Sequence, residues 1–456
     1  MKILIVGDGK VGYTLAENLS REDNDVTIID KNPEALRKAK ENLDVMCIRG
    51  SGVSVSVLLE AGVREADLLI AATSSDEMNM VVTLTGKKLG ARRTIARIRD
   101  PEYANELSLL KLELGLDLVI NPEQSAANEM ARILHYPAAV NVESFAKGRV
   151  ELVEIRMTGD EPIVGIKLRK ISSRLLSPIL IGAVERDGDV VIPDGECDIR
   201  ENDILHVVGR TANTVDFCKA MGKCELRIRN VMIVGGGRIA YYLVRMLTNL
   251  GLRVKIIEID RNRCLELAEL LPGVLVIQGD GTDADLLQSE NLGDMDAFVA
   301  MTGRDEDNLI LSLMARKAGV RKIIAKVTRM NLAGLVESLE LDSIVSPRLI
   351  TANHILQYVR GIRNATGERI EALHRIVDGK AEILEFLLQE RRWYLDTPLK
   401  KLGARKGFLV AAIIRNTEVI IPHGDDVLKL HDRVIVFAKT RALNSLDEVF
   451  RPGAAP

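Results

Sequence analysis

Two glycine-rich stretches of this chain have the spacing of phosphate-binding loops. The pattern G-x-G-x-x-G/A occurs twice, 228 positions apart, in Gly7, Gly9 and Gly12 and again in Gly235, Gly237 and Ala240. In such a loop the first glycine permits a tight turn, the second lets the backbone approach a pyrophosphate, and the third lets the next helix pack closely. The start of that helix presents free N–H groups to the phosphates. The pattern predicts two nucleotide sites; the alternative is two turns that keep their glycines without a ligand.

An acidic residue follows each loop at the distance where a ribose would bind. Asp30 lies 18 residues after Gly12, and Glu258 lies 18 residues after Ala240. A carboxylate at the end of the second strand accepts hydrogen bonds from ribose hydroxyls and repels a 2′-phosphate. NAD or a plain adenosine nucleotide is therefore favoured over NADP, unless each acid is only a turn residue.

The two loops differ in charge. Lys10 and Arg238 occupy the same place, where a cation can reach phosphate oxygens. The residue before them is Asp8 in the first loop and Gly236 in the second. We therefore expect the first site to prefer NAD(H) and the second a more highly charged nucleotide, ATP or ADP. The alternative is that both cations are simply solvated.

The repeat extends beyond the loops and sets the organisation of the chain. DLLIAATSSDEMN (67–79) matches DAFVAMTGRDEDN (296–308), and the region 188–209 matches 417–438. In the first unit short apolar strands alternate with helical stretches, which is typical of a doubly wound parallel sheet. Those strands are predicted at 2–6, 26–30, 44–48, 67–72, 93–98 and 117–120. The second unit has short Val- and Ile-rich strands and one short predicted helix at 163–172.

The predicted fold class is α/β, with two Rossmann-like doubly wound parallel-sheet domains, each followed by a small α+β domain. Two helices, at 122–135 and 347–360, each follow a proline and lead out of the Rossmann-like domains. The predicted segments are nucleotide-binding domains at 1–121 and 229–346, crossover helix linkers at 122–140 and 347–368, and small domains at 141–226 and 369–453.

Composition excludes several classes of function. The net charge is −3 and aromatic residues make up 3% of the chain, which argues against a nucleic-acid partner. The longest apolar runs, such as FLVAAII at 408–414, are shorter than the ~18–20 residues that span a bilayer. The first residues run straight into a predicted strand, so we expect no signal peptide. Five cysteines, including Cys218 and Cys224, lack tight metal-ligand spacing, so we expect no metal and a reduced, cytosolic setting.

The residues expected of an enzyme are missing. None of the six histidines recurs at an equivalent place in the repeat, although chemistry done twice should duplicate its base. The sequence also lacks a Walker A motif, a His-Glu-x-x-His motif and a nucleophile elbow. We expect no catalytic residues and a nucleotide that is sensed rather than consumed. The alternatives are an NAD-dependent oxidoreductase with an unidentified substrate and a stand-alone sensor whose small domains bind a second ligand.

The duplicated order of glycine loop, VTIID, GSG, AATSSDEMN and a small β-rich domain resembles the TrkA family over about residues 1–450. These are the peripheral nucleotide-binding subunits of Trk potassium-uptake systems, built from tandem RCK (regulator of potassium conductance) N-lobes and C-lobes. The resemblance implies NAD(H) and ATP/ADP as ligands and a homo-oligomeric ring, usually a tetramer. It places this cytoplasmic ring at the inner face of the cell membrane, docked on a Trk-type potassium channel or transporter that it gates.

Matching the motifs residue by residue, the resemblance implies two sets of binding residues. The first site would use Gly7, Asp8, Gly9, Lys10, Val11, Gly12, Asp30, Ser51, Thr73, Ser74, Arg97 and Ile98. The second would use Gly235, Gly236, Gly237, Arg238, Ile239, Ala240, Glu258, Asp280, Thr302, Gly303, Lys326 and Val327. Thr73 and Thr302 suit a ribose or phosphate contact, or equally a helix N-cap.

The resemblance also bears on the two sites' equivalence and on assembly. Ser51 in the first copy corresponds to Asp280 in the second, which suggests that the sites are not equivalent. In the family the crossover helix swaps between neighbouring N-lobes and builds the ring. The alternative is a helix that packs inside one domain.

Overall fold

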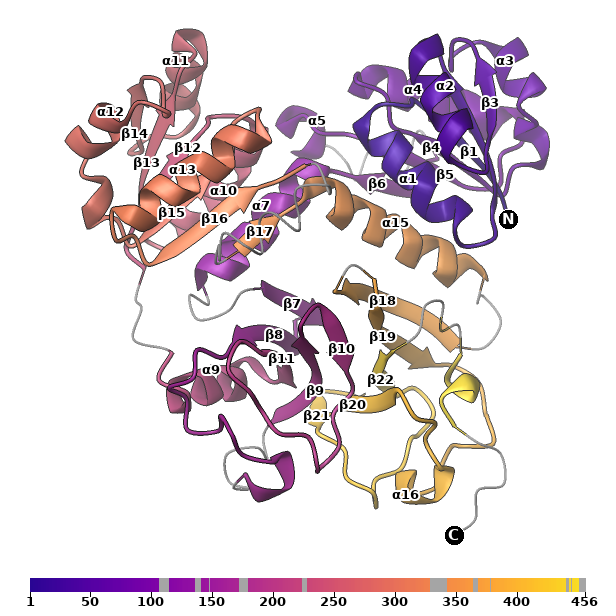
Figure 1. Cartoon of the computed structure of the whole chain (residues 1–456). Helices are drawn as coiled ribbons and strands as arrows, with labels where there is room; N and C mark the ends of the chain where they lie inside the picture. The colour runs from indigo at the N-terminus through magenta and orange to yellow at the C-terminus, as the bar shows by residue number, and fades with distance from the viewer. Residues whose placement is uncertain are drawn as a thin grey trace.

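The described part of the chain contains two parallel and two antiparallel sheets, one of each per half (Figure 1). The computed structural model describes residues 1–105, 115–135, 141–146, 148–171, 179–223, 228–328, 343–363, 368–377, 379–439, 443 and 445–450. Parts of the predicted segments (136–140, 224–226, 364–367 and 451–453), together with Cys224, lie outside the described residues.

The first N-lobe is built on a parallel sheet whose strands run in the order β3-β2-β1-β4-β5-β6. Its central strands are short and almost wholly apolar, because helices cover both faces of a doubly wound sheet. The strands are β1 (Lys2–Val6), β2 (Asp25–Asp30), β3 (Met46–Arg49), β4 (Leu68–Ala71), β5 (Thr94–Arg97) and β6 (Leu118–Ile120).

Helices connect these strands and begin close to the strand ends. Gly9 precedes α1, whereas the side chains of Asn32 and Ser75 cap α2 and α4 by accepting backbone N–H bonds. Gly90 ends α4 with a positive φ of 125°. The helices are α1 (Lys10–Ser20), α2 (Pro33–Asn42), α3 (Val55–Glu60), the 3₁₀ helix η1 (Val63–Glu65), α4 (Asp76–Leu89) and α5 (Pro101–Asn105).

The second N-lobe repeats this plan in the order β14-β13-β12-β15-β16-β17, again with parallel neighbours. Its strands are β12 (Asn230–Val234), β13 (Arg253–Glu258), β14 (Leu275–Gln278), β15 (Ala297–Ala300), β16 (Lys322–Lys326) and β17 (Ser343–Val345). Its helices are α10 (Arg238–Asn249), α11 (Arg261–Leu270), α12 (Ala284–Ser289), η3 (Leu292–Asp294) and α13 (Asp305–Lys317).

The two C-lobes are antiparallel sheets of equivalent order, β10-β9-β11-β8-β7 and β21-β20-β22-β19-β18. The helix predicted at 163–172 is wrong: within the described part of that range only a 3₁₀ turn, η2, forms. The first C-lobe has β7 (Asn141–Phe145), β8 (Val150–Arg156), η2 (Leu168–Lys170), β9 (Ile179–Arg186), β10 (Asp189–Val191), β11 (Ile204–Gly209) and α9 (Thr211–Ala220). The second has β18 (Glu368–Ile376), β19 (Ala381–Leu388), α16 (Leu399–Leu402), β20 (Phe408–Arg415), β21 (Glu418–Ile420), β22 (Arg433–Ala438) and η5 (Leu446–Glu448).

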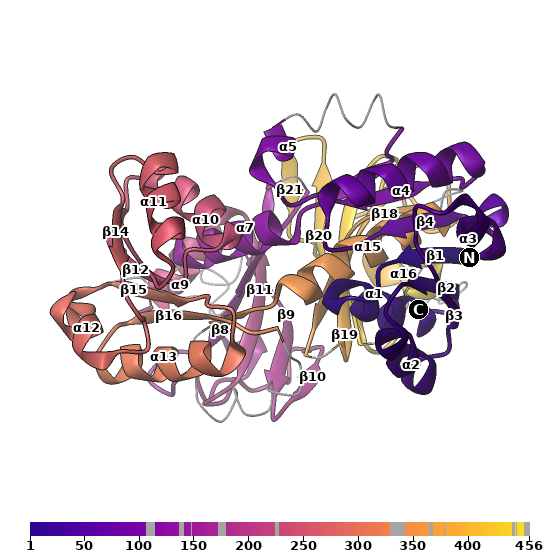
Figure 2. The same cartoon turned by 90° about the horizontal axis from the view of Figure 1, so that it is seen from above.

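The two crossover helices exchange places between the halves. The apolar face of α7 (Pro122–His135), including Met130 and Leu134, shares a buried core with Leu243 of the second N-lobe. The helix α15 (Pro347–Arg363) packs Ile355 against Leu15 of the first N-lobe. Both views show α7 beside α10 and α15 beside α1 of the first N-lobe (Figures 1 and 2). Each half therefore completes the core of the other.

The two C-lobes also share a core. The ring of Phe437 in the second lobe packs so closely on the first that a Cβ on Gly182 would lie 2.1 Å from it. The backbone N–H of Ala146 donates a 2.8 Å hydrogen bond to Glu385 across the same junction. Among the described helices, none is long and apolar enough to cross a membrane.

Candidate functional site

The first glycine loop lies where the strand order reverses between β1 and β4. Ligands of open α/β sheets bind at such a switch point, beyond the carboxyl ends of the strands. Gly7 follows β1 with a φ of +102°, a conformation that favours glycine, and a Cβ there would lie 2.9 Å from the backbone N of Thr73. The turn after β1 and the turn after β4 are therefore in direct contact.

Gly12 and Gly9 have different surroundings. A Cβ on Gly12 would lie 1.8 Å from the carbonyl oxygen of Gly7, so this glycine allows α1 to pack on the turn. Gly9 is exposed, N-caps α1 with extended backbone, and a Cβ there would meet nothing within 4 Å. The space beside Gly9 is open, as the approach of a pyrophosphate requires.

Asp30 holds the loop in place. Its Oδ2 accepts a 2.5 Å hydrogen bond from the N–H of Asp8, and its Oδ1 accepts a 2.7 Å bond from Asn32. The second copy repeats the first bond, since Glu258 accepts from Gly236 at 2.5 Å. Each carboxylate thus has a structural role besides any contact to a ribose.

Asp8 is turned into the protein and does not line the cavity described below. Its side chain is 7% exposed, and neither carboxylate oxygen has a hydrogen-bond partner. Burial and the nearby Asp30 raise the pKa of Asp8 to about 7. Asp8 is therefore less charged near pH 7 than an exposed carboxylate, which reduces the charge difference expected between the two loops.

Thr73 and Thr302 make the same internal contacts in the two halves. The hydroxyl of Thr73 donates to Asn79 Oδ1 at 2.7 Å, and that of Thr302 donates to Asn308 Oδ1 at 2.8 Å. Neither threonine is a helix N-cap, because Ser75 precedes α4 and Arg304 precedes α13. These contacts fix the turn that follows the fourth strand of each sheet.

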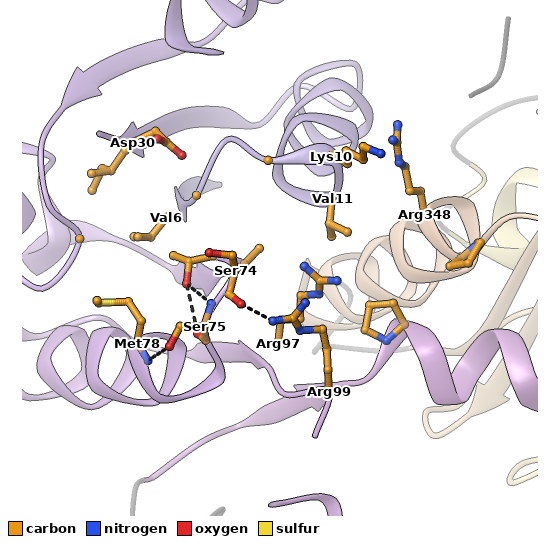
Figure 3. Close-up of a pocket in the computed structure, with 18 of the residues that line it drawn as sticks. Val6, Lys10, Val11, Asp30, Ser74, Ser75, Met78, Arg97, Arg99 and Arg348 are labelled. Carbon is orange, nitrogen blue, oxygen red and sulfur yellow. Dashed lines mark hydrogen bonds between the residues drawn. The ribbon is translucent and has the colours of Figure 1, made fainter. Parts of the chain in front are cut away.

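Cations gather at the end of the first site that lies away from Asp30. Arg97 donates to Glu123 at 3.2 Å, and Arg99 donates to Asp76 at 3.2 Å. Figure 3 shows Asp30 at one end of the pocket and Lys10, Arg97, Arg99 and Arg348 at the other. A nucleotide with its ribose at Asp30 would direct its phosphates toward these cations.

These groups surround a cavity of about 590 Å³. Of the first predicted set, it is lined by Gly7, Gly9, Lys10, Val11, Asp30, Ser51, Thr73, Ser74 and Arg97. Asp8, Gly12 and Ile98 do not line it, and Ile98 is fully buried. Two residues predicted for the second site, Ile239 and Lys326, also line this cavity.

The second loop repeats the backbone geometry of the first. Gly235 has a φ of +104°, Gly237 N-caps α10, Arg238 is exposed, and Ala240 is buried where Gly12 stands in the first copy. Arg263 on α11 donates to the carbonyl of Gly236 at 2.6 Å. Arg263 therefore holds the second loop through a side-chain bond, and the residue aligned with it in the first copy is Ala35, which has no such group.

The other residues predicted for the second site lie at the ends of its strands. Asp280 is exposed and accepts from the backbone N–H and hydroxyl of Thr282. Gly303 is exposed beside Thr302, and Val327 is buried after Lys326. Among the described residues, no three His, Cys, Asp or Glu side chains are arranged to hold a metal ion.

Sequence reasoning missed several residues that line the first cavity. Arg99 lines the cavity, but the aligned residue in the second half is the uncharged Thr328. Comparison of the two repeats therefore does not indicate that Arg99 is a binding residue. Glu123 and Arg348 follow the prolines at the starts of α7 and α15. Their opposite charges at equivalent positions were visible in the sequence and could have identified them.

Comparison with known proteins agrees with this architecture. The TrkA-N domain matches residues 3–122 and 231–347, and the TrkA-C domain matches 152–222 and 383–451. The chain belongs to the TrkA family. A TrkA homologue from Methanosarcina mazei, called a Trk system potassium uptake protein, is 36% identical over 99% of this chain and 100% of its own length. The Trk system potassium uptake protein TrkA of Azorhizobium caulinodans is 32% identical over 99% of each chain.

Solved structures share the fold of this TrkA-family chain at low identity. The RCK domain of GsuK superimposes with a TM-score of 0.63 at 19% identity, covering 96% of this chain and 92% of that one. The GsuK channel bound to NAD gives a TM-score of 0.64 at 18% identity, covering 96% and 76%. The α/β fold class with Rossmann-like parallel sheets is confirmed.

Proposed function

We propose that this TrkA-family chain is a regulatory subunit of a potassium-uptake system and not an enzyme. Its N-lobes bind NAD(H) and ATP or ADP, and the bound nucleotide sets the state of a Trk-type membrane channel or transporter. The subunit acts at the inner face of the cell membrane as a ring-shaped homo-oligomer, a tetramer of tandem chains.

One observation carries the proposal: the cavity at the first glycine loop is built by both halves of the chain. Lys10 and Asp30 come from the first half, whereas Lys326 and Arg348 come from the second. A ligand in this cavity contacts both N-lobes, so it binds more tightly to one relative placement of the lobes than to another. That difference in affinity is what allows a ligand to shift a conformational equilibrium.

The cavity suits a sensor better than an oxidoreductase. Its described lining contains no His side chain, the most frequent group for proton transfer, and its carboxylates Asp30 and Glu123 already accept hydrogen bonds from the protein. The names of the relatives and the NAD-bound and ADP-bound forms of the GsuK channel support a nucleotide-regulated potassium pathway.

Binding is tested first, by thermal shift of the full chain with NAD, NADH, ATP, ADP and NADP. A ligand that binds only the native state raises the unfolding midpoint as its concentration increases. At a free concentration of 100 times its Kd, it adds about 2.7 kcal/mol to the free energy of unfolding. We expect Asp30→Asn to weaken binding at the first site, and Asp25→Asn, at the exposed start of the same strand, to leave it unchanged.

Potassium flux then tests regulation. Vesicles containing the Trk-type membrane partner are measured with the chain added, with and without nucleotide. A flux that responds to nucleotide in the wild type and not in a loop variant supports the proposal. The absence of any nucleotide-dependent midpoint shift in the wild type would contradict it.

A further inference from the structure

The helix that begins at the second glycine loop reaches the first cavity. This helix is α10, and its first residue, Arg238, belongs to that loop. Ile239 follows and lines the first cavity together with Arg99. Tyr242 lies one helical turn after Arg238 on the same helix and is 7% exposed. Because α10 is part of the second N-lobe, it contacts a site that lies outside its own lobe.

The hydroxyl of Tyr242 joins the two halves beside Arg99. It donates a 2.9 Å hydrogen bond to the backbone carbonyl of Arg99 and accepts a 3.0 Å bond from Nδ2 of Asn121. Arg99 follows β5, and Asn121 lies between β6 and α7. Burial raises the pKa of Tyr242 to about 12, so at neutral pH the hydroxyl keeps the proton that it donates. Tyr242 therefore fixes the end of β5 and the start of α7 from the opposite half of the chain.

The side chain of Arg99 is held by its own lobe at the wall of the cavity. Its Nε donates to Asp76 Oδ1 at 3.2 Å, and its Nη2 donates to the carbonyl of Ser74. Within the described residues no hydrogen bond engages Nη1 of Arg99. Figure 3 shows Arg99 at the same end of the pocket as Lys10 and Arg97. Its Nη1 group is thus left for a phosphate oxygen, while its other groups hold the side chain in place.

The end of the equivalent strand in the second half lacks this link. In the repeat Thr328 takes the place of Arg99, and its N–H and hydroxyl each donate to the Asp305 carboxylate at 2.9 Å. Thr14 takes the place of Tyr242, and its hydroxyl donates within its own helix. Of the two equivalent strand ends, only the first has an arginine that is tied to the opposite N-lobe.

We propose that Tyr242 is a positioning residue of the first nucleotide site. From the opposite half of the chain it fixes the end of β5, so that Nη1 of Arg99 contacts a phosphate of the bound nucleotide. This inference rests on the proposed nucleotide-binding function and adds a way in which that site is regulated. Affinity at the first site then depends on how α10 is docked, and by linkage a bound nucleotide stabilises the same docking.

Equilibrium binding of ATP and NADH to the full chain tests the role of Tyr242. The variants are compared in a Gly237→Ala background, which obstructs the second loop, so that the first site is the one measured. We expect Tyr242→Phe to weaken binding about fivefold, the usual effect of one lost hydrogen bond, because the ring still packs. Tyr241→Phe is the matched control. It removes the neighbouring hydroxyl, which accepts from Arg245 of the same helix, and should leave the affinity unchanged.

A double-mutant cycle separates positioning from a general effect on the fold. Arg99→Gln should itself weaken binding, and adding Tyr242→Phe should then cause less than about a 1.5-fold further loss, because the tyrosine acts through Arg99. Losses that multiply, or an unchanged affinity in Tyr242→Phe, would overturn the inference. A wild-type chain that binds neither ATP nor NADH would instead contradict the proposed function itself.

Discussion

At the scale of single residues, the glycines of the first loop meet different constraints. Packing requires glycine at position 12, because a Cβ added there would overlap the carbonyl oxygen of Gly7. Gly9 has open space around it and a φ of −74° that any residue adopts. The fold therefore does not require glycine at position 9, whereas a closely approaching phosphate does.

Gly9→Ala should separate binding from stability. We expect a stability loss below about 1 kcal/mol, since only the N-cap preference of α1 changes. Nucleotide affinity at the first site should fall about tenfold, or ~1.4 kcal/mol, because the new methyl group occupies the phosphate approach. Gly237→Ala is the matched control and should affect only the second site. Unchanged affinity in both variants would show that no phosphate approaches these loops.

At the scale of elements, α15 links the first N-lobe to the second C-lobe. Arg360 near its end is 1% exposed and donates to Glu22, just after α1, at 2.9 Å and to Glu382 on β19 at 2.8 Å. Arg375 on β18 also contacts both carboxylates. The helix that begins at the glycine loop is thus tied through α15 to a C-lobe strand.

Arg360→Met should destabilise the chain by about 3 kcal/mol, because two buried carboxylates lose their main cationic partner. Thermal and urea unfolding measure the loss. Arg37→Met, at an exposed position on α2, is the control and should change stability by less than about 0.5 kcal/mol. Equal effects of the two substitutions would mean that the buried network adds no specific stability.

At the scale of the whole molecule, a chain of ionisable side chains crosses the junction between the halves. His374 on β18 places Nδ1 3.3 Å from Glu143 on β7 and Nε2 3.6 Å from Glu154 on β8. Burial alone would lower the pKa of His374, but the two carboxylates outweigh it and raise that pKa to about 10. The imidazolium therefore joins the C-lobes at neutral pH.

This arrangement predicts a pH dependence of stability. The folded pKa of His374 lies above its unfolded value of about 6.5, so its contribution is complete below about pH 6.5 and is lost as the pH rises through about 10. His374→Gln should flatten the decline of the free energy of unfolding across this window. His423→Gln, exposed on the second C-lobe, should leave the decline unchanged. Parallel curves for wild type and His374→Gln would contradict the assignment.

Local sequence patterns determined much of this architecture. The predicted strands of the first N-lobe agree with β1 to β6 to within two residues, since apolar runs of strand length alternate there with helical stretches. The glycine turns and the acids after the second strands were also evident, because each depends on residues close together in the chain. The family followed from the order of these motifs and is confirmed by the matches to TrkA-N and TrkA-C.

The tertiary structure alone decided where the crossover helices pack and which residues complete each site. The apolar face of α7 or α15 indicates that the helix is buried, but it does not indicate which N-lobe the helix packs against. Both N-lobes contribute apolar side chains to the core around such a helix. The inward turn of Asp8 and the placement of Arg348 beside Lys10 likewise depend on contacts that the local pattern does not encode. Residues more than 200 positions apart meet in the first cavity, and only the folded chain brings their charges together.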